Sequence, residues 1–226
     1  PIARLLNING AASNYYLDRV QVTGQVSATA TADSPATLSV SSIQQVAATD
    51  VVASTGPQPF ANIACAFSNI PARPKTIVEY QTMFGNTYPN LDHYFRDMSY
   101  NAINLTGSFT VGYYVIGPKN SYFFDAPANQ NPDLDAIAQD CVTAADPDIN
   151  FNVVVGMNLM INDLLGCCAY GGGAIVFADG AWRDIRTTWD PPWAQEYDVI
   201  GHEMGHAFGI PHSTGPSGSP PSGVWP

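Results

Sequence analysis

The sequence predicts an α+β protein whose main part is a mixed sheet with helices packed against it. Two observations favour this class. From residue 60 onward, short apolar runs of strand length alternate with stretches of helical spacing, and no segment repeats at a fixed period. Strands and helices that alternate along one chain are typical of a sheet covered by helices. The length of 226 residues fits one principal core.

Strands are predicted where apolar or β-branched residues alternate or run together between turn residues. Alternation near the N-terminus predicts short antiparallel strands at residues 16–27 and 37–46. Four further stretches read as strands: residues 61–67, 104–116, 151–157 and 173–177.

Helical spacing predicts four helices, at residues 75–84, 91–99, 133–145 and 190–208. Either Asn131 or Asp133 suits the N-cap of the third. Asp190 suits the N-cap of the last, since prolines follow it in the first turn, and Gly209 suits its end.

Composition divides the chain into three parts. Residues 1–56 are rich in Ala, Ser, Thr and Val, which indicates a small β-rich segment, either a β module or the remnant of a pro-segment. Residues 57–212 carry the main domain, and residues 213–226 read as a flexible tail. The first residue is Pro rather than Met, which indicates a processed product.

The chain is acidic, with eight Lys and Arg against nineteen Asp and Glu and a net charge of -11. This charge repels phosphate backbones and anionic lipid headgroups, so we expect neither a nucleic-acid nor a membrane partner. No apolar run is long enough to span a bilayer. The sequence leaves the oligomeric state open.

Four cysteines are present, namely Cys65, Cys141, Cys167 and Cys168. One or two disulfides are expected, and a bridge between the adjacent Cys167 and Cys168 is the least favoured pairing because its ring is strained. Cys65 lies in an apolar run, which predicts buried packing or a disulfide. Disulfides and the sequon at Asn104 favour a secreted protein over a cytosolic one with four buried thiols.

Three of the four histidines fall within eleven residues near the end of the last predicted helix. His202 and His206 are four apart, so a helix directs both imidazoles to one side. Gly209 permits a left-handed turn that brings His212 round as a third ligand. Three imidazoles with an open fourth position are typical of a catalytic zinc site.

Glu203 follows the first predicted ligand directly, at about 100° around the helix. It can therefore reach a zinc-bound water without ligating the metal, which predicts a general base for hydrolysis of a peptide bond. The fourth histidine, His93, is expected to face solvent or to make a hydrogen bond.

The string HEMGHAFGIPH, residues 202–212, resembles the HExxHxxGxxH signature of the metzincin zinc endopeptidases. The run LDHYFRDMSYNAINLTGSF, the glycine-rich CCAYGGGAIVF and the short CAFS extend the resemblance over about residues 60–212 and are most similar to gametolysin-type secreted proteases. The immune-inhibitor-type proteases are close competitors.

The resemblance implies a catalytic subdomain with a twisted, mainly parallel sheet, a backing helix and an active-site helix. It also implies that a substrate lies along an antiparallel edge strand. Gly171–Gly173 suit that edge, although an ordinary loop or bulge explains them equally well. Metzincins place a methionine turn after the third ligand, and no Met follows His212. We therefore expect the C-terminal subdomain, with part of the specificity pocket, to lie beyond this chain.

The sequence thus predicts a secreted, zinc-dependent endopeptidase that acts on proteins or peptides, including extracellular or cell-wall glycoproteins. The alternatives are a zinc-stabilised extracellular binding module and an inactive fragment of a protease. A calcium ion held by the acidic residues is a weaker interpretation than helix capping and solvated charge. Those residues are Asp133, Asp135, Asp146 and Asp148.

Overall fold

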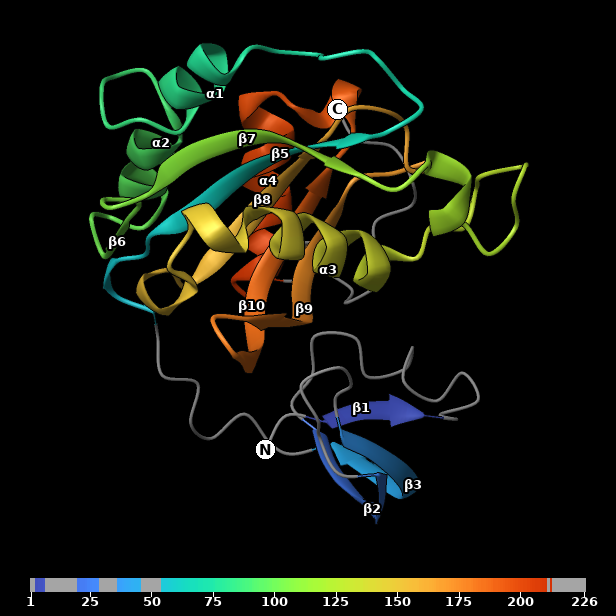
Figure 1. Ribbon diagram of the computed structural model, residues 1–226. Coiled ribbons are helices and arrows are strands. Elements are labelled where there is room, and N and C mark those ends of the chain that lie inside the picture. Colours follow the sequence, from blue (N-terminus) through green and yellow to red (C-terminus); the bar gives the residue numbers. More distant parts are fainter. Residues whose placement is uncertain (1–2, 7–19, 29–35, 46–53, 211, 213–226) are drawn as a thin grey trace.

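The computed structural model describes residues 3–6, 20–28, 36–45, 54–210 and 212. Its central element is a five-stranded sheet in the order β7-β5-β8-β10-β9 (Figure 1). Four strands are parallel and β9 runs antiparallel to β10 at the edge. The strands are β5 (Phe60–Phe67), β7 (Phe109–Ile116), β8 (Gly156–Ile161), β9 (Tyr170–Ala178) and β10 (Ala181–Asp190).

Helices cover both faces of this sheet. One face packs against α3 (Leu134–Ala145), and the other packs against α1 (Ile77–Met83), α2 (Leu91–Met98) and α4 (Tyr197–Ala207). The α+β class with a mixed sheet is confirmed. None of the helices in the described part of the chain is long and apolar enough to cross a membrane.

Strand β5 shows how the sheet serves two cores. Its side chains alternate, so Ile63 and Cys65 join the cluster under α3, whereas Phe60 and Ala64 join the cluster under α4. Every residue of β5 is buried. A strand buried on both faces reads as one continuous apolar run, which is why the sequence predicted it within one residue.

Three of the four predicted helices begin and end close to the expected residues. Thr76 and Glu79 form a capping box at α1, Asn90 caps α2, and Asp133 caps α3 by accepting from the Ala136 N–H at 3.0 Å. Between the two caps weighed for α3, the structure uses Asp133.

The last helix begins later than predicted. Asp190 is not its N-cap but the final residue of β10, paired with Met160 of β8, and α4 starts at Tyr197 after a short 3₁₀ turn, Pro192–Ala194. The Asp-Pro pair suited a helix start, but pairing in the sheet and full burial of Asp190 decided otherwise.

Two strand predictions also need correction. The predicted strand at residues 151–157 is a 3₁₀ turn, Phe151–Val153, followed by β8, which starts at Gly156. Strand β10 was not predicted. The predicted stretch 104–116 divides into β6 (Ile103–Asn104) and β7.

The N-terminal strands form a separate sheet in the order β1-β3-β2. These are β1 (Ala3–Leu6), β2 (Val20–Ala28) and β3 (Ala36–Gln45). The strand β4 (Gly56–Pro57) spans the predicted boundary and pairs with β6. Parts of the two predicted N-terminal strands, residues 16–19 and 46, and the predicted tail, residues 213–226, lie outside the described residues.

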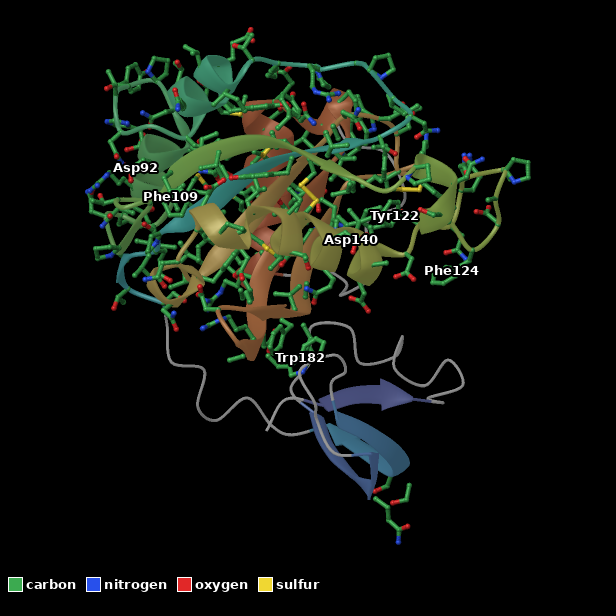
Figure 2. All side chains as sticks on the ribbon, viewed as in Figure 1. Asp92, Phe109, Tyr122, Phe124, Asp140 and Trp182 are labelled. Atoms are coloured by element: carbon green, nitrogen blue, oxygen red, sulfur yellow. A yellow bond between two sulfur atoms is a disulfide. The ribbon has the colours of Figure 1, made fainter. Side chains whose placement is uncertain are left out.

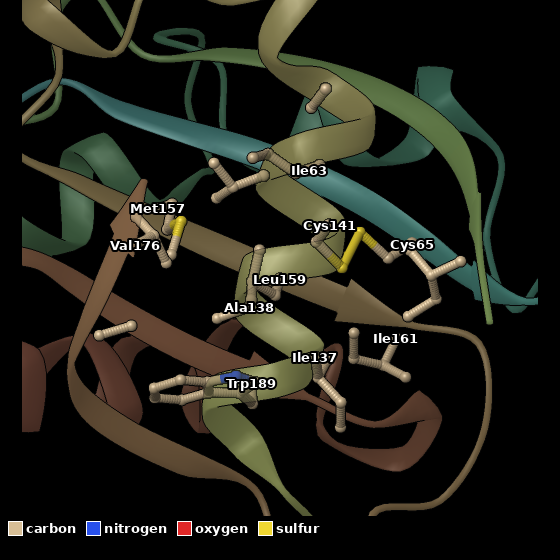
Figure 3. Close-up of a cluster of buried hydrophobic side chains, with 14 of the residues drawn as sticks. Ile63, Cys65, Ile137, Ala138, Cys141, Met157, Leu159, Ile161, Val176 and Trp189 are labelled. Atoms are coloured by element: carbon tan, nitrogen blue, oxygen red, sulfur yellow. A yellow bond between two sulfur atoms is a disulfide. The ribbon is translucent and has the colours of Figure 1, made fainter. Parts of the chain in front are cut away.

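All four cysteines are paired in two disulfides. Cys65 of β5 bonds Cys141 of α3, with Cα atoms 6.0 Å apart, inside the cluster shown in Figure 3. Cys167 bonds Cys168. The expectation that the adjacent pair is the least favoured bridge was therefore wrong: packing α3 onto β5 brings the other two cysteines together and leaves the neighbours for each other.

Candidate metal centre

The three predicted ligands converge at the end of α4. His202 and His206 lie one helical turn apart with their Nε2 atoms 3.0 Å from each other. The ring of His212 lies 4.5 Å from that of His206 and 5.4 Å from that of His202, measured between centroids. One nitrogen from each histidine lies within 4.8 Å of the others, so a single ion can contact all three.

A glycine turn brings His212 back toward the helix. Gly209 has φ +86°, and its N–H donates to the His206 carbonyl at 2.8 Å. The Ile210 N–H donates to the Gly205 carbonyl at 2.9 Å. These two bonds make a Schellman motif, which needs a left-handed residue where the helix stops. Gly209 is therefore the turn that the sequence predicted.

The environment of the imidazoles favours neutral donors. The Nδ1 atom of His206 lies 2.7 Å from the Ile210 carbonyl oxygen, which can only accept, so Nδ1 carries a hydrogen and Nε2 is the nitrogen that can bind a metal in the neutral ring. Burial lowers the pKa of His202, and the neighbouring His206 and His212 lower it further. Neutral imidazole is the form that binds a metal.

Glu203 lies on the buried side of α4, with 9% of its surface exposed. Burial raises the pKa of its carboxyl group, and the nearby His206 partly opposes this rise. A carboxyl group with a raised pKa both accepts and returns a proton more readily near neutral pH.

Helix α4 lies in direct contact with the edge strand β9. A Cβ atom at Gly171 would overlap the backbone carbonyl of Glu203, so only glycine permits this approach. The next residue, Gly172, would place a Cβ in open space. Gly171–Gly173 pair in regular register with β10 and are not a loop or bulge.

Among the described residues, the possible metal group consists of these three histidines and includes none of the other residues weighed from the sequence. His93 is half-buried on α2, and its Nδ1 lies 2.9 Å from the Asn90 side-chain oxygen, as expected for a hydrogen-bonded histidine. The structure does not gather the four acidic residues at one point. Asp133 and Asp135 lie at the start of α3, whereas Asp146 and Asp148 follow the other end of this twelve-residue helix.

The sequence analysis missed a group of buried polar residues beneath α4. Asn62, Asn158, Thr188 and Asp190 are each fully buried, and they link neighbouring strands by hydrogen bonds. Thr188 and Asp190 lie on β10, and the β-branched residues and two tryptophans of this strand were the signal from which it could have been predicted.

No protein-family model, no curated protein and no solved structure matches the chain. The resemblance to the metzincins therefore depends on the sequence motifs alone.

Proposed function

We propose that this protein is a zinc-dependent endopeptidase in which His202, His206 and His212 hold the metal and Glu203 is the general base. The observation that carries this proposal is the convergence of three imidazoles beside a buried carboxyl group on the same helix. Three neutral nitrogen donors fit zinc, and three protein ligands leave a position open for water or substrate.

Zinc in this position supplies Lewis acidity, which makes water more acidic and a carbonyl carbon more electrophilic. The protein's own residues do the rest. The hydrogen bond from His206 to the Ile210 carbonyl fixes the ring that ligates. Glu203 takes the proton from the attacking water and returns it to the leaving amine, and its raised pKa suits both steps.

The architecture supports a metzincin-like catalytic subdomain. The family resemblance implies a mainly parallel sheet, a backing helix, an active-site helix and an antiparallel edge strand, and the proposal assigns the last three roles to α3, α4 and β9. A peptide that adds to β9 as a further strand would run alongside the helix that carries Glu203, because Gly171 holds the two in contact. The substrate class is therefore an extended segment of a protein.

The two disulfides support an extracellular location. We expect the substrates there to be extracellular proteins or cell-wall glycoproteins.

The experiment is cleavage of casein by the purified chain, with and without a zinc chelator, combined with the substitution Glu203→Gln. The variant should bind zinc as the wild type does and lose about 10²–10⁴-fold in cleavage rate, the usual contribution of a general base. Glu196→Gln is the matched control, because Glu196 also belongs to α4's N-terminal end but is exposed and pairs with Lys75.

Cleavage by Glu203→Gln at the wild-type rate would exclude the assigned base. A wild-type chain that binds one zinc ion and cleaves no protein substrate would instead favour one of the two alternatives, a zinc-stabilised binding module or an inactive fragment of a protease.

A further inference from the structure

A row of hydrogen bonds crosses four strands beneath α4. It begins at the backbone carbonyl of Phe109 on β7, labelled in Figure 2, which accepts from Asn62 Nδ2 on β5 at 2.9 Å. Asn158 Nδ2 on β8 donates to Asn62 Oδ1 at 2.7 Å. On β10, Thr188 Oγ1 lies 2.8 Å from Asn158 Oδ1 and 2.6 Å from Asp190 Oδ2.

The first members of the row fix the direction of the others. A carbonyl oxygen only accepts, so the Asn62 atom that faces Phe109 is its amide nitrogen and the atom that faces Asn158 is its oxygen. Asn158 must then present its nitrogen to Asn62 and its oxygen to Thr188. The second N–H of Asn158 faces the weak acceptor Met204 Sδ at 3.6 Å, which agrees with this orientation.

Thr188 has one hydroxyl hydrogen, and the row assigns it to Asn158 Oδ1. The bond between Thr188 Oγ1 and Asp190 Oδ2 then needs a hydrogen from Asp190. An ionised Asp190 would leave two acceptors competing for the one hydrogen of Thr188. A protonated carboxyl group satisfies the whole row from Asp190 to Phe109.

The surroundings of Asp190 agree with the proton count. The side chain is fully buried, and its Oδ1 atom has no hydrogen-bond partner in the part of the chain that the structure describes. The titratable groups that face it are Glu203 from α4 and Tyr80 from α1, and neither is a cation. Burial is the main cause that raises the pKa of Asp190, and Glu203 adds to it. The bond to Thr188 lowers the pKa only where Thr188 donates it, and the row already uses the Thr188 hydrogen for Asn158.

We propose that Asp190 is a neutral carboxylic acid in the folded protein and that in this form it is a positioning residue for α4. Its side chain ends the row that contacts Met204 of α4 through Asn158. Its backbone carbonyl accepts from Gln195 Nε2 at 2.8 Å, just before α4 begins. We infer this from how α4 docks on the sheet, without reference to peptide cleavage, and only its zinc-affinity test rests on the proposed metal site.

The neutral state has a definite effect on stability against pH. Aspartate in the unfolded chain loses its proton near pH 4, whereas folded Asp190 keeps its proton to higher pH. The folded state therefore binds one proton more across that interval, and the contribution of Asp190 to stability is greatest in acid and falls as the pH rises. An asparagine, which cannot ionise but donates to Thr188 through its amide, removes this dependence.

The first experiment compares chemical unfolding of wild type, Asp190→Asn and Asp190→Ala between pH 4 and 8, with Asp184→Asn as the control from the exposed part of the same strand. Relative to Asp190→Asn, the unfolding equilibrium constant of the wild type should rise by about tenfold per pH unit until folded Asp190 ionises. Asp184→Asn should show no such slope. Asp190→Ala, which donates nothing to Thr188, should bind zinc more weakly, and Asp190→Asn should restore wild-type affinity.

A second measurement needs no variant. In wild type labelled with ¹³C at the aspartate carboxyl carbons, one resonance should titrate at a clearly higher pH than the others. The proposal is overturned if every aspartate resonance has titrated below pH 5, or if wild type and Asp190→Asn show the same pH dependence of unfolding. It is also overturned if Asp190→Asn loses zinc affinity as far as Asp190→Ala does.

Discussion

Helix α3 packs on one face of the central sheet through apolar side chains and a disulfide, whereas α4 packs on the other face above a row of buried polar groups. Under α3, Ile137 and Ala138 join Ile63 and Leu159 in one cluster around the Cys65–Cys141 bond (Figure 3). Under α4, apolar residues such as Ile200 and Met204 share the interface with Asn158 and Asp190.

The two interfaces differ in what they determine: apolar packing under α3 stabilises the fold, and the polar row under α4 sets the position of that helix. Apolar packing is non-directional and stabilises many related arrangements of α3. Buried polar groups are costly unless each has a hydrogen-bond partner. The hydrogen-bonded row under α4 therefore favours one position of this helix on the sheet over other positions. Helix α4, whose position the row favours, carries His202, Glu203 and His206.

The largest expected effect tests the α3 face. Replacing both Cys65 and Cys141 with Ser opens a loop closed across 76 residues and should lower the free energy of unfolding by about 4 kcal/mol. Zinc stoichiometry at a temperature where the variant is folded should stay at the wild-type value.

The matched control is the double variant Cys167→Ser with Cys168→Ser. It removes a bridge between neighbours that closes almost no loop, so its unfolding midpoint in denaturant should hardly change. Loss of zinc in the first variant alone would show that the two faces are coupled.

An intermediate effect tests the contact between β9 and α4. Gly171→Ala places a methyl group against the Glu203 carbonyl, so α4 must move and the protein should lose about 1–3 kcal/mol, the usual range for overpacking. Zinc affinity should fall with it, because two of the three proposed ligands, His202 and His206, lie on that helix. Gly172→Ala is the neighbouring control with open space at its Cβ. Calorimetric titration measures the zinc affinity of the two variants. Equal zinc affinities of Gly171→Ala and Gly172→Ala would mean that α4 adapts without displacing the proposed ligands.

The smallest expected effect compares two glycines of the histidine motif. Gly209→Ala forces a side chain into a left-handed conformation and should cost about 1–2 kcal/mol. Gly205→Ala, inside α4 with open space at its Cβ, should instead gain about 0.5–1 kcal/mol from helix propensity. Opposite shifts in thermal midpoint support the turn assigned to Gly209. A shift of the same sign in both variants would contradict it.

Sequence reasoning succeeded where the signal was local. The (i, i+4) spacing of His202 and His206 and the turn at Gly209 define a cluster of three imidazoles with little help from the rest of the chain. The Asp133 cap and the buried run of β5 are local in the same sense.

The failures have a common cause. Asp190 has the local features of a helix cap, yet it lies in β10, where it is paired with Met160 of the distant strand β8. The pairing of Cys167 with Cys168 likewise follows from where α3 packs Cys141. Such choices depend on contacts between distant segments, which periodicity and spacing do not contain.

The sequence by itself determined the fold class, the histidine cluster and the carboxyl group beside it, because helix geometry places residues four apart on one side and glycine supplies the turn. Only the tertiary structure decided how that helix is held. Gly171 meets the Glu203 backbone, and Asp190 completes a row of bonds across four strands, because side chains far apart in sequence share protons and space only after the sheet has formed.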